Sequence, residues 1–140
     1  MVSLNTKEDF IKTINSILNQ KYHNYEIIVV DGNSNDGTIR EINKLKNKLK
    51  KKIIEKDKGI YHAMNKGIKY INSNLTVFLN SGDVLSNRNI LNKINLIMKK
   101  HKEVDIIVGK NIVRSDFKYY SKYEKIHDLT FSSVFSHQST

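Results

Sequence analysis

The chain contains no cysteine, no proline and no tryptophan. Because cysteine is absent, disulfide bonds and thiolate metal sites are excluded. No apolar run approaches the roughly 18 residues that a membrane-spanning helix needs. The first residues also lack the basic and then apolar order of a signal peptide, so we expect a cytoplasmic protein. Its 140 residues fit a single domain, residues 1–140, with a real hydrophobic core.

Positive charge is in excess, with a formal net charge of +10. Much of it lies in one run from Lys44 to Lys52, on a helical pattern that places Ile42, Leu45 and Leu49 on the opposite face. A solvated helix face is the favoured interpretation of this run. Peripheral contact with acidic lipid headgroups, at the inner face of the plasma membrane, is the main alternative. Nucleic acid is disfavoured as a partner because no aromatic residues interleave the lysines.

Three apolar runs each lead into a carboxylate, at residues 26–31, 53–57 and 76–83. Short runs rich in valine and isoleucine between turn residues are typical of buried strands, and we predict strands at 25–31, 52–55, 75–79 and 105–109. Helical patterns alternate with them, at 6–20, 38–49, 59–71 and 90–98. A weaker pattern predicts a hairpin from 111 to 121 around Ser115 and Asp116, and residues 131–140 show no clear period.

This alternation predicts an α/β fold with a mostly parallel sheet and helical crossovers. Ligands of such sheets lie outside the carboxyl ends of the strands, so the three polar loops are expected to meet in one site. The first strand is short and the chain stops soon after Gln138. We therefore expect the domain to be incomplete at its first strand and at its C-terminus. A missing first strand would expose a sheet edge, through which the chain could form oligomers.

Three acidic positions carry the chemistry of the predicted site. Asp31 stands where a carboxylate can accept hydrogen bonds from a ribose hydroxyl or a base N–H. Asp83 offers an oxygen ligand of the kind that Mg²⁺ or Mn²⁺ prefers, with Ser81 beside it. Asp57 and Lys58 precede a helix N-terminus, which is a natural anion site. Each of these is also good turn or capping chemistry, and that plainer interpretation stays open.

Other reaction classes find no support in the sequence. The five histidines show no metal-ligand spacing, so a zinc site is disfavoured. Neither a Gly-Xaa-Ser-Xaa-Gly elbow nor a glycine-rich Lys-Ser/Thr loop is present, which argues against those hydrolases and against P-loop NTPases.

Taken in order, four segments closely resemble the family 2 glycosyltransferases. They run from Ser16 to Tyr22, from Tyr25 to Thr38, from Glu55 to Ile68 and from Phe78 to Asp83. The likeness covers roughly residues 2–110, and the third segment looks most like the branch that builds bacterial surface polysaccharides.

The resemblance implies a GT-A fold, which is a Rossmann-like αβα sandwich, here in its donor-binding half. It implies an inverting transfer from a nucleotide diphosphate sugar, with UDP expected, to a growing surface polysaccharide or lipid-linked glycan. It also implies Mg²⁺ or Mn²⁺ as cofactor, with Asp83 as metal ligand. The donor-binding positions that it implies are Val2, Ser3, Asp31, Asn33, Ser34, Asp57, Lys58, Asn65, Ser81 and Asp83.

The chain departs from the family pattern at four places. The motif that ends in Asp83 supplies one carboxylate. Leu4 stands where many relatives carry an aromatic residue that stacks on the base, and His62 occupies a position often filled by aspartate. The usual catalytic base is expected beyond Thr140. Donor binding without transfer is therefore the alternative hypothesis, and a nucleotidyltransferase is disfavoured because no glycine-rich basic loop follows the first strand.

Overall fold

The computed structural model describes residues 1–103, 106–107, 113–114 and 119–120. The chain divides into two compact units, Met1–Lys102 and Glu103–Thr140, and each is described by itself. The expectation of a single domain over residues 1–140 stays a prediction.

The first unit is built on a parallel three-stranded sheet. Its strands are β1 (Val2–Ser3), β2 (Ile28–Asp31) and β3 (Lys51–Ile54), in the spatial order β1-β2-β3. Val2 pairs with Val30, and Asp31 pairs with Ile54, so the three strands end at the same edge. A helix follows each strand, α1 (Lys7–Leu18), α2 (Thr38–Lys44) and α3 (Ile60–Ile68) in turn. The predicted α/β alternation is confirmed.

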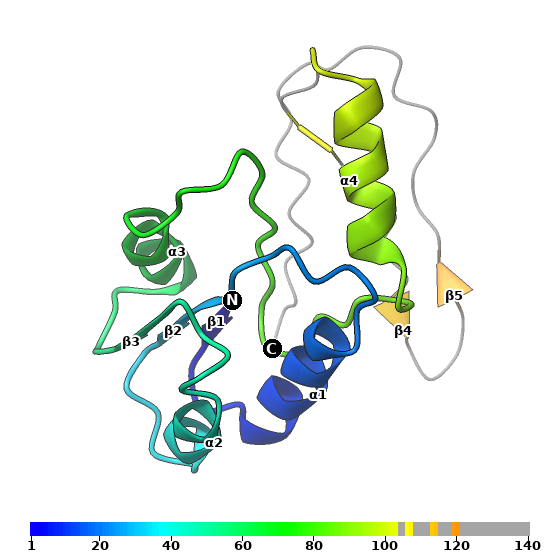
Figure 1. Ribbon diagram of the computed structural model, residues 1–140. Helices are drawn as coiled ribbons and strands as arrows, with labels where there is room; N and C mark the ends of the chain where they lie inside the picture. The colour runs from blue at the N-terminus through cyan, green and yellow to red at the C-terminus, as the bar shows by residue number, and fades with distance from the viewer. Residues whose placement is uncertain (104–105, 108–112, 115–118, 121–140) are drawn as a thin grey trace. The chain divides into compact units, whose positions relative to one another are not determined.

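Alternate residues of β2 face two different helical layers. Val29 packs with Phe10 of α1 and Ile42 of α2, and all three are fully buried. Val30 points the other way, into a second cluster with Ala63 of α3. Figure 1 shows α1 and α2 on one side of the sheet and α3 on the other. Because side chains of a strand alternate between its faces, β2 contributes to both hydrophobic cores of an αβα sandwich.

Helix α2 is shorter than its apolar pattern predicts. It ends at Lys44, where the N–H of Leu45 bonds the carbonyl of Ile42, and the next turn is closed by a bond from Lys48 to Leu45. Both bonds span three residues rather than four, so the lysine-rich stretch continues as tight turns. The other helices and strands of this unit stand where predicted, mostly with narrower bounds; the exception is the segment at residues 75–79.

The predicted strand at residues 75–79 is wrong for the described structure. The segment meets β1 through one isolated parallel bridge, Val2 to Asn80. Val2 donates to the carbonyl of Leu79 at 3.1 Å and accepts from the N–H of Ser81 at 3.1 Å. Only Val2 of β1 bonds this neighbour in the described structure, so the contact is a single bridge and residues 75–79 form no ladder. β1 is bonded on both sides, to β2 and to residues 79–81.

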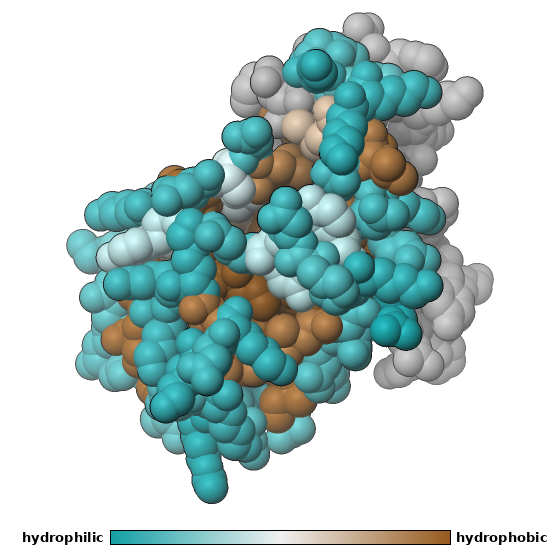
Figure 2. All heavy atoms as spheres, in the orientation of Figure 1, coloured by the Kyte–Doolittle hydropathy of each residue, from teal (hydrophilic) through white to brown (hydrophobic). Residues whose placement is uncertain are grey.

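The remaining described elements are α4 (Ile90–Lys100) and a hairpin of β4 (Val113–Arg114) and β5 (Tyr119–Tyr120). The antiparallel pairing of β4 and β5 confirms the predicted hairpin. Most of the predicted strand at 105–109, and all of residues 131–140, lie outside the described residues. None of the helices in the described part of the chain is both long and apolar enough to cross a bilayer. Hydrophilic residues cover most of the face seen in Figure 2, with hydrophobic atoms reaching the surface between them.

Candidate nucleotide-sugar site

Asp31, at the end of β2, is fully buried and bound inside the protein. Its Oδ1 accepts the N–H of Ser34 at 2.7 Å. Its Oδ2 accepts the hydroxyls of Ser3 and Ser34, each at 2.7 Å. The Ser34 hydroxyl in turn accepts the N–H of Asn5 at 2.8 Å. The structure therefore brings three predicted residues together, and it commits the Asp31 carboxylate to holding two loops in place.

Gly32 forms a point of close approach that the sequence analysis missed. Its N–H bonds the carbonyl of Ser3 at 2.9 Å. A Cβ on Gly32 would lie 2.8 Å from Oδ2 of Asp57 and 3.0 Å from Cδ1 of Leu4. Leu4 is 52% exposed, and together with the Asp57 carboxylate it covers Gly32, which is buried. A glycine directly after a strand-end acid was the signal that could have identified this position.

In the loop from β3 into α3, two backbone N–H groups bond to side chains of the same segment. Oδ1 of Asp57 accepts from the N–H of Gly59 at 2.8 Å, and Nδ1 of His62 accepts from the N–H of Lys58 at 2.9 Å. Lys58 is exposed at the start of α3, as the prediction of an anion site requires. Asn65 is exposed further along α3, and no hydrogen bond links its side chain to another predicted site residue in the described part of the chain.

The loop that ends in Asp83 lies on the other flank of β1. The N–H and the hydroxyl of Ser81 both bond the carbonyl of Val2, at 3.1 and 3.3 Å. Oδ2 of Asp83 accepts from the N–H of Asn80 at 2.8 Å, which closes the turn. Asn33, in contrast, sits on the loop after β2, exposed and with a φ of 71°.

Thr13 of α1 anchors the loop that ends in Asp83, and sequence analysis did not select this residue. It is fully buried, its hydroxyl accepts the N–H of Gly82 at 2.9 Å, and it lies 3.4 Å from the carbonyl of Asn80. A threonine between Phe10 and Ile17, on the apolar face of a helix, was the available signal.

The metal-ligating potential of the site is modest. No group of three or more histidine, aspartate or glutamate side chains converges anywhere in the described residues. Asp83 has one carboxylate oxygen outside the turn bond, and Oδ1 of the neighbouring Asn80 is buried without a hydrogen-bond partner. These oxygens fit a hard cation that takes most of its ligands from a bound diphosphate and water.

Asp36 accepts hydrogen bonds from the first residues of α1 and α2. Its Oδ1 accepts the N–H and the hydroxyl of Thr38, at 2.9 and 2.6 Å, and its Oδ2 accepts the N–H of Lys7 at 2.8 Å. One carboxylate therefore satisfies backbone groups at the starts of both α1 and α2. The hydrogen bond from the Thr38 hydroxyl is the main cause that lowers the pKa of Asp36 below its usual value. Ser34, on the same loop, bonds instead to Asp31.

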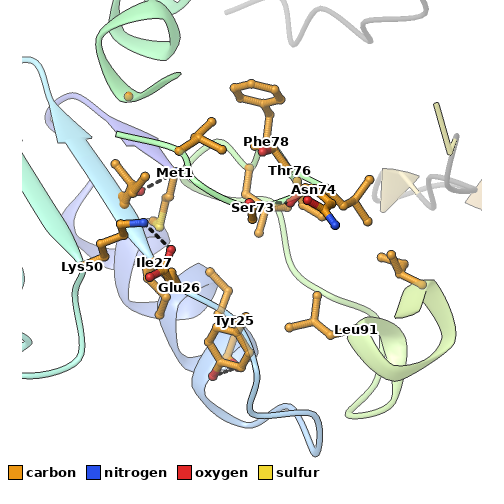
Figure 3. Close-up of a pocket in the computed structure, with 18 of the residues that line it drawn as sticks. Met1, Tyr25, Glu26, Ile27, Lys50, Ser73, Asn74, Thr76, Phe78 and Leu91 are labelled. Carbon is orange, nitrogen blue, oxygen red and sulfur yellow. Dashed lines mark hydrogen bonds and ion pairs between the residues drawn. The ribbon is translucent and has the colours of Figure 1, made fainter. Parts of the chain in front are cut away.

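A large pocket lies at the opposite end of the sheet from these residues. It has a volume of about 860 Å³ and is lined by Met1 and Ile27, near the amino ends of β1 and β2, and by residues 71–79 and α4. Figure 3 shows Met1 and Ile27 on one side, Ser73 and Phe78 on the other, and the ion pair of Lys50 with Glu26 beside them. Of the ten predicted donor residues, Val2 alone lines this pocket. Its lining is largely apolar, so it does not suit a diphosphate.

A parallel αβα sandwich with acids and a basic loop at its carboxyl edge has the arrangement of a GT-A fold. The sequence model of the family described as "Glycosyl transferase family 2" matches residues 1–138, and the chain belongs to this family.

Two curated relatives show how far the likeness extends. A PGL/p-HBAD biosynthesis glycosyltransferase of Mycobacterium bovis is 28% identical over 130 residues, which cover 90% of this chain and 50% of the relative. The Escherichia coli UDP-Glc:alpha-D-GlcNAc-diphosphoundecaprenol beta-1,3-glucosyltransferase WfgD is 24% identical over 135 residues, covering 96% and 53%. The chain thus spans about half the length of these relatives.

Solved structures confirm the fold. S. aureus TarS in complex with UDP-GlcNAc superimposes with a TM-score of 0.65 at 23% identity, over 72% of this chain and 30% of the other. The mannosyltransferase PcManGT of Pyrobaculum calidifontis, in complex with GDP-Man and Mn²⁺, gives a TM-score of 0.59 at 22% identity, over 69% and 30%. At these identities the likeness establishes the GT-A fold.

Proposed function

We propose that this chain binds a nucleotide diphosphate sugar, with UDP as the nucleotide, for inverting transfer of the sugar to a growing cell-envelope glycan. The observation that carries the proposal is the meeting of the Asp57 loop, the Asp31 loop and the Asp83 loop at one sheet edge, in a member of this family. The names of the relatives support it, because WfgD is named for a UDP-Glc donor and a diphosphoundecaprenol-linked acceptor.

We place the nucleoside against Leu4 and Asp57, the two side chains that cover the buried Gly32. In this arrangement Leu4 packs on the base, and Asp57 accepts a hydrogen bond from the base or the ribose. The exposed Asn33 follows Gly32, and Ser3, Asp31 and Ser34 hold this loop through buried hydrogen bonds.

The diphosphate is placed between α3 and the Asp83 loop. Lys58 and the N-terminus of α3 supply positive charge, with Asn65 further along the same helix. Val2 and Ser81 hold the Asp83 loop against β1. With Mg²⁺ or Mn²⁺ bound, Asp83 is the protein ligand, and the cation neutralises charge on the departing diphosphate.

In the proposed reaction an acceptor hydroxyl attacks the anomeric carbon, and the bond to the diphosphate breaks on the opposite face. A carboxylate base takes the proton of the hydroxyl, and we assign this base to no described residue. Lys58 stabilises the negative charge that develops on the leaving diphosphate.

Calorimetric titration of the 140-residue chain with UDP, with and without Mn²⁺, tests the donor site. We expect Mn²⁺-dependent binding that Asp83→Ala abolishes. Glu41→Ala is the matched control, because Glu41 pairs with Lys44 on α2, away from the strand ends, and binding should survive its loss. Absence of binding to UDP, GDP, CDP and dTDP by the folded chain would refute the proposal. Binding without sugar transfer to any lipid-linked acceptor would favour the alternative of a donor-binding chain.

A peripheral membrane contact through the run from Lys44 to Lys52 is the second part of the proposal. Lys44 and Lys50 pair with Glu41 and Glu26, whereas Lys46 and Lys48 are exposed and form no ion pair in the described structure. Free lysines of this kind suit anionic headgroups at the inner face of the plasma membrane. Cosedimentation with phosphatidylglycerol vesicles should fall when both are replaced by glutamate, and it should be absent with phosphatidylcholine alone.

A further inference from the structure

Three side chains fasten the loop between β3 and α3. Lys66 donates to the carbonyl of Lys56 at 2.7 Å and pairs with Glu55 at 3.0 Å. Asp57 accepts from Gly59, and His62 accepts from Lys58 at 2.9 Å. The loop therefore depends on hydrogen bonds of a carboxylate, an ammonium group and an imidazole. Each of these groups can make its hydrogen bond in only one of its two protonation states.

The bond to the imidazole requires that Nδ1 of His62 carries no proton. A ring nitrogen accepts a hydrogen bond when it carries no proton, and histidine is the ordinary side chain that changes charge between pH 5 and 8. A proton on Nδ1 of His62 would face the N–H of Lys58, donor against donor. The ring must then turn away, and the backbone N–H of Lys58 loses its partner inside the protein.

We infer that His62 is a positioning residue for the nucleotide site, which holds the loop of Asp57 and Lys58 in its binding arrangement when the imidazole is neutral. The inference rests on the proposed function. The link is geometric, because the loop that His62 closes carries the Asp57 carboxylate to within 2.8 Å of the Cβ position of Gly32. If that loop loosens, both the carboxylate and the Lys58 ammonium leave the places assigned to them.

The charges near His62 nearly cancel in pairs. In the loop, Asp57 and Lys58 carry opposite charges, and one turn further along α3 Lys66 is neutralised by Glu55. A proton on His62 therefore adds one exposed positive charge, and solvent screens its attraction for a diphosphate. Loss of the direct hydrogen bond acts on the loop itself, so we expect acidification to weaken nucleotide binding.

The variant His62→Asn offers the matched control, because Oδ1 of asparagine and Nδ1 of histidine are both two bonds from Cβ. The asparagine oxygen accepts the Lys58 N–H at every pH of interest, whereas alanine in His62→Ala removes the acceptor. Titration of the 140-residue chain with UDP at pH 8.0 and pH 5.5 compares the three proteins. The terminal phosphate of UDP also takes up a proton with a pKa near 6, so the informative quantity is the difference between variants.

Between pH 8.0 and 5.5 we expect the wild type to lose roughly two- to tenfold more affinity than His62→Asn, which corresponds to one hydrogen bond. His62→Ala should bind roughly two- to tenfold more weakly than the wild type already at pH 8.0. Equal pH responses of the wild type and His62→Asn would overturn the inference. Failure of the wild type to bind UDP at pH 8.0 would instead overturn the proposed donor site.

A second measurement reads the hydrogen bond without any nucleotide. The amide proton of Lys58, followed by nitrogen-15 NMR exchange, should lose protection in the wild type as the pH falls to 5.5, relative to His62→Asn. Equal protection of this amide in both proteins at pH 5.5 would also overturn the inference, whatever the titrations show.

Discussion

Replacement of Asp31 tests whether its buried carboxylate holds the strand ends together. The side chain is fully buried and accepts three hydrogen bonds of 2.7 Å, two from Ser34 and one from Ser3. Asp31→Ala leaves these donors without their acceptor in a site closed to water. Removing a buried charged acceptor in this way costs about 3–5 kcal/mol of the free energy of unfolding.

Asp31→Asn is expected to cost less, about 1–2 kcal/mol. Its remaining oxygen still accepts the N–H of Ser34, and its amide group can donate to the oxygen atoms of the two hydroxyls. The control is Asp83→Ala, because Asp83 is half-buried and accepts one turn hydrogen bond from Asn80. We expect that control to cost less than about 1 kcal/mol.

Urea denaturation followed by far-ultraviolet circular dichroism measures all three variants. Domains of this size have total stabilities of about 5–15 kcal/mol, so a loss of this size is measurable while the protein remains folded. The reasoning would be refuted if Asp31→Ala unfolded within about 0.5 kcal/mol of the wild type, since a buried three-bond acceptor cannot be that dispensable.

Three further predictions rest on single contacts. Gly32→Ala displaces the flexible end of Asp57, so the free energy of unfolding should change little. The affinity for UDP, measured by calorimetry, should fall roughly tenfold or more, and an unchanged affinity would contradict the role of Asp57. Thr13→Val leaves the N–H of Gly82 without its acceptor and should cost about 1–2 kcal/mol in urea denaturation, whereas Thr13→Ser should retain the bond. Burial lowers the pKa of the Met1 amino group from 8.0 to about 6. Between these values the unfolded chain binds more protons, so the free energy of unfolding should rise from pH 6 to pH 8 by up to about 2–3 kcal/mol, and acetylation of the amino group should abolish this rise.

The order of elements in the first unit follows from local patterns, which is why the sequence predicts it well. Valine and isoleucine runs that end in acids specify parallel strands, and the stripe of Phe10, Ile14 and Ile17 specifies the buried face of α1. These signals need no knowledge of distant residues, because period and turn chemistry are properties of short segments. The same reasoning predicts that the acids meet at one edge, since parallel strands end together.

What the acids do at that edge depends on contacts between residues far apart in the chain. Asp31 is bound by Ser3, which is 28 residues away, and Thr13 anchors a loop that follows 67 residues later. The segment at 75–79 meets β1 through a single bridge, Val2 to Asn80, and the composition of the segment does not reveal how few bonds its neighbour makes with it. The amino-acid sequence by itself thus determined the α/β order, the core stripes and the sheet edge at which the strand-end acids lie. The tertiary structure decided that the Asp31 carboxylate is enclosed and that the Asp57 carboxylate stays partly exposed, because burial and hydrogen bonding depend on what the rest of the fold places beside each side chain.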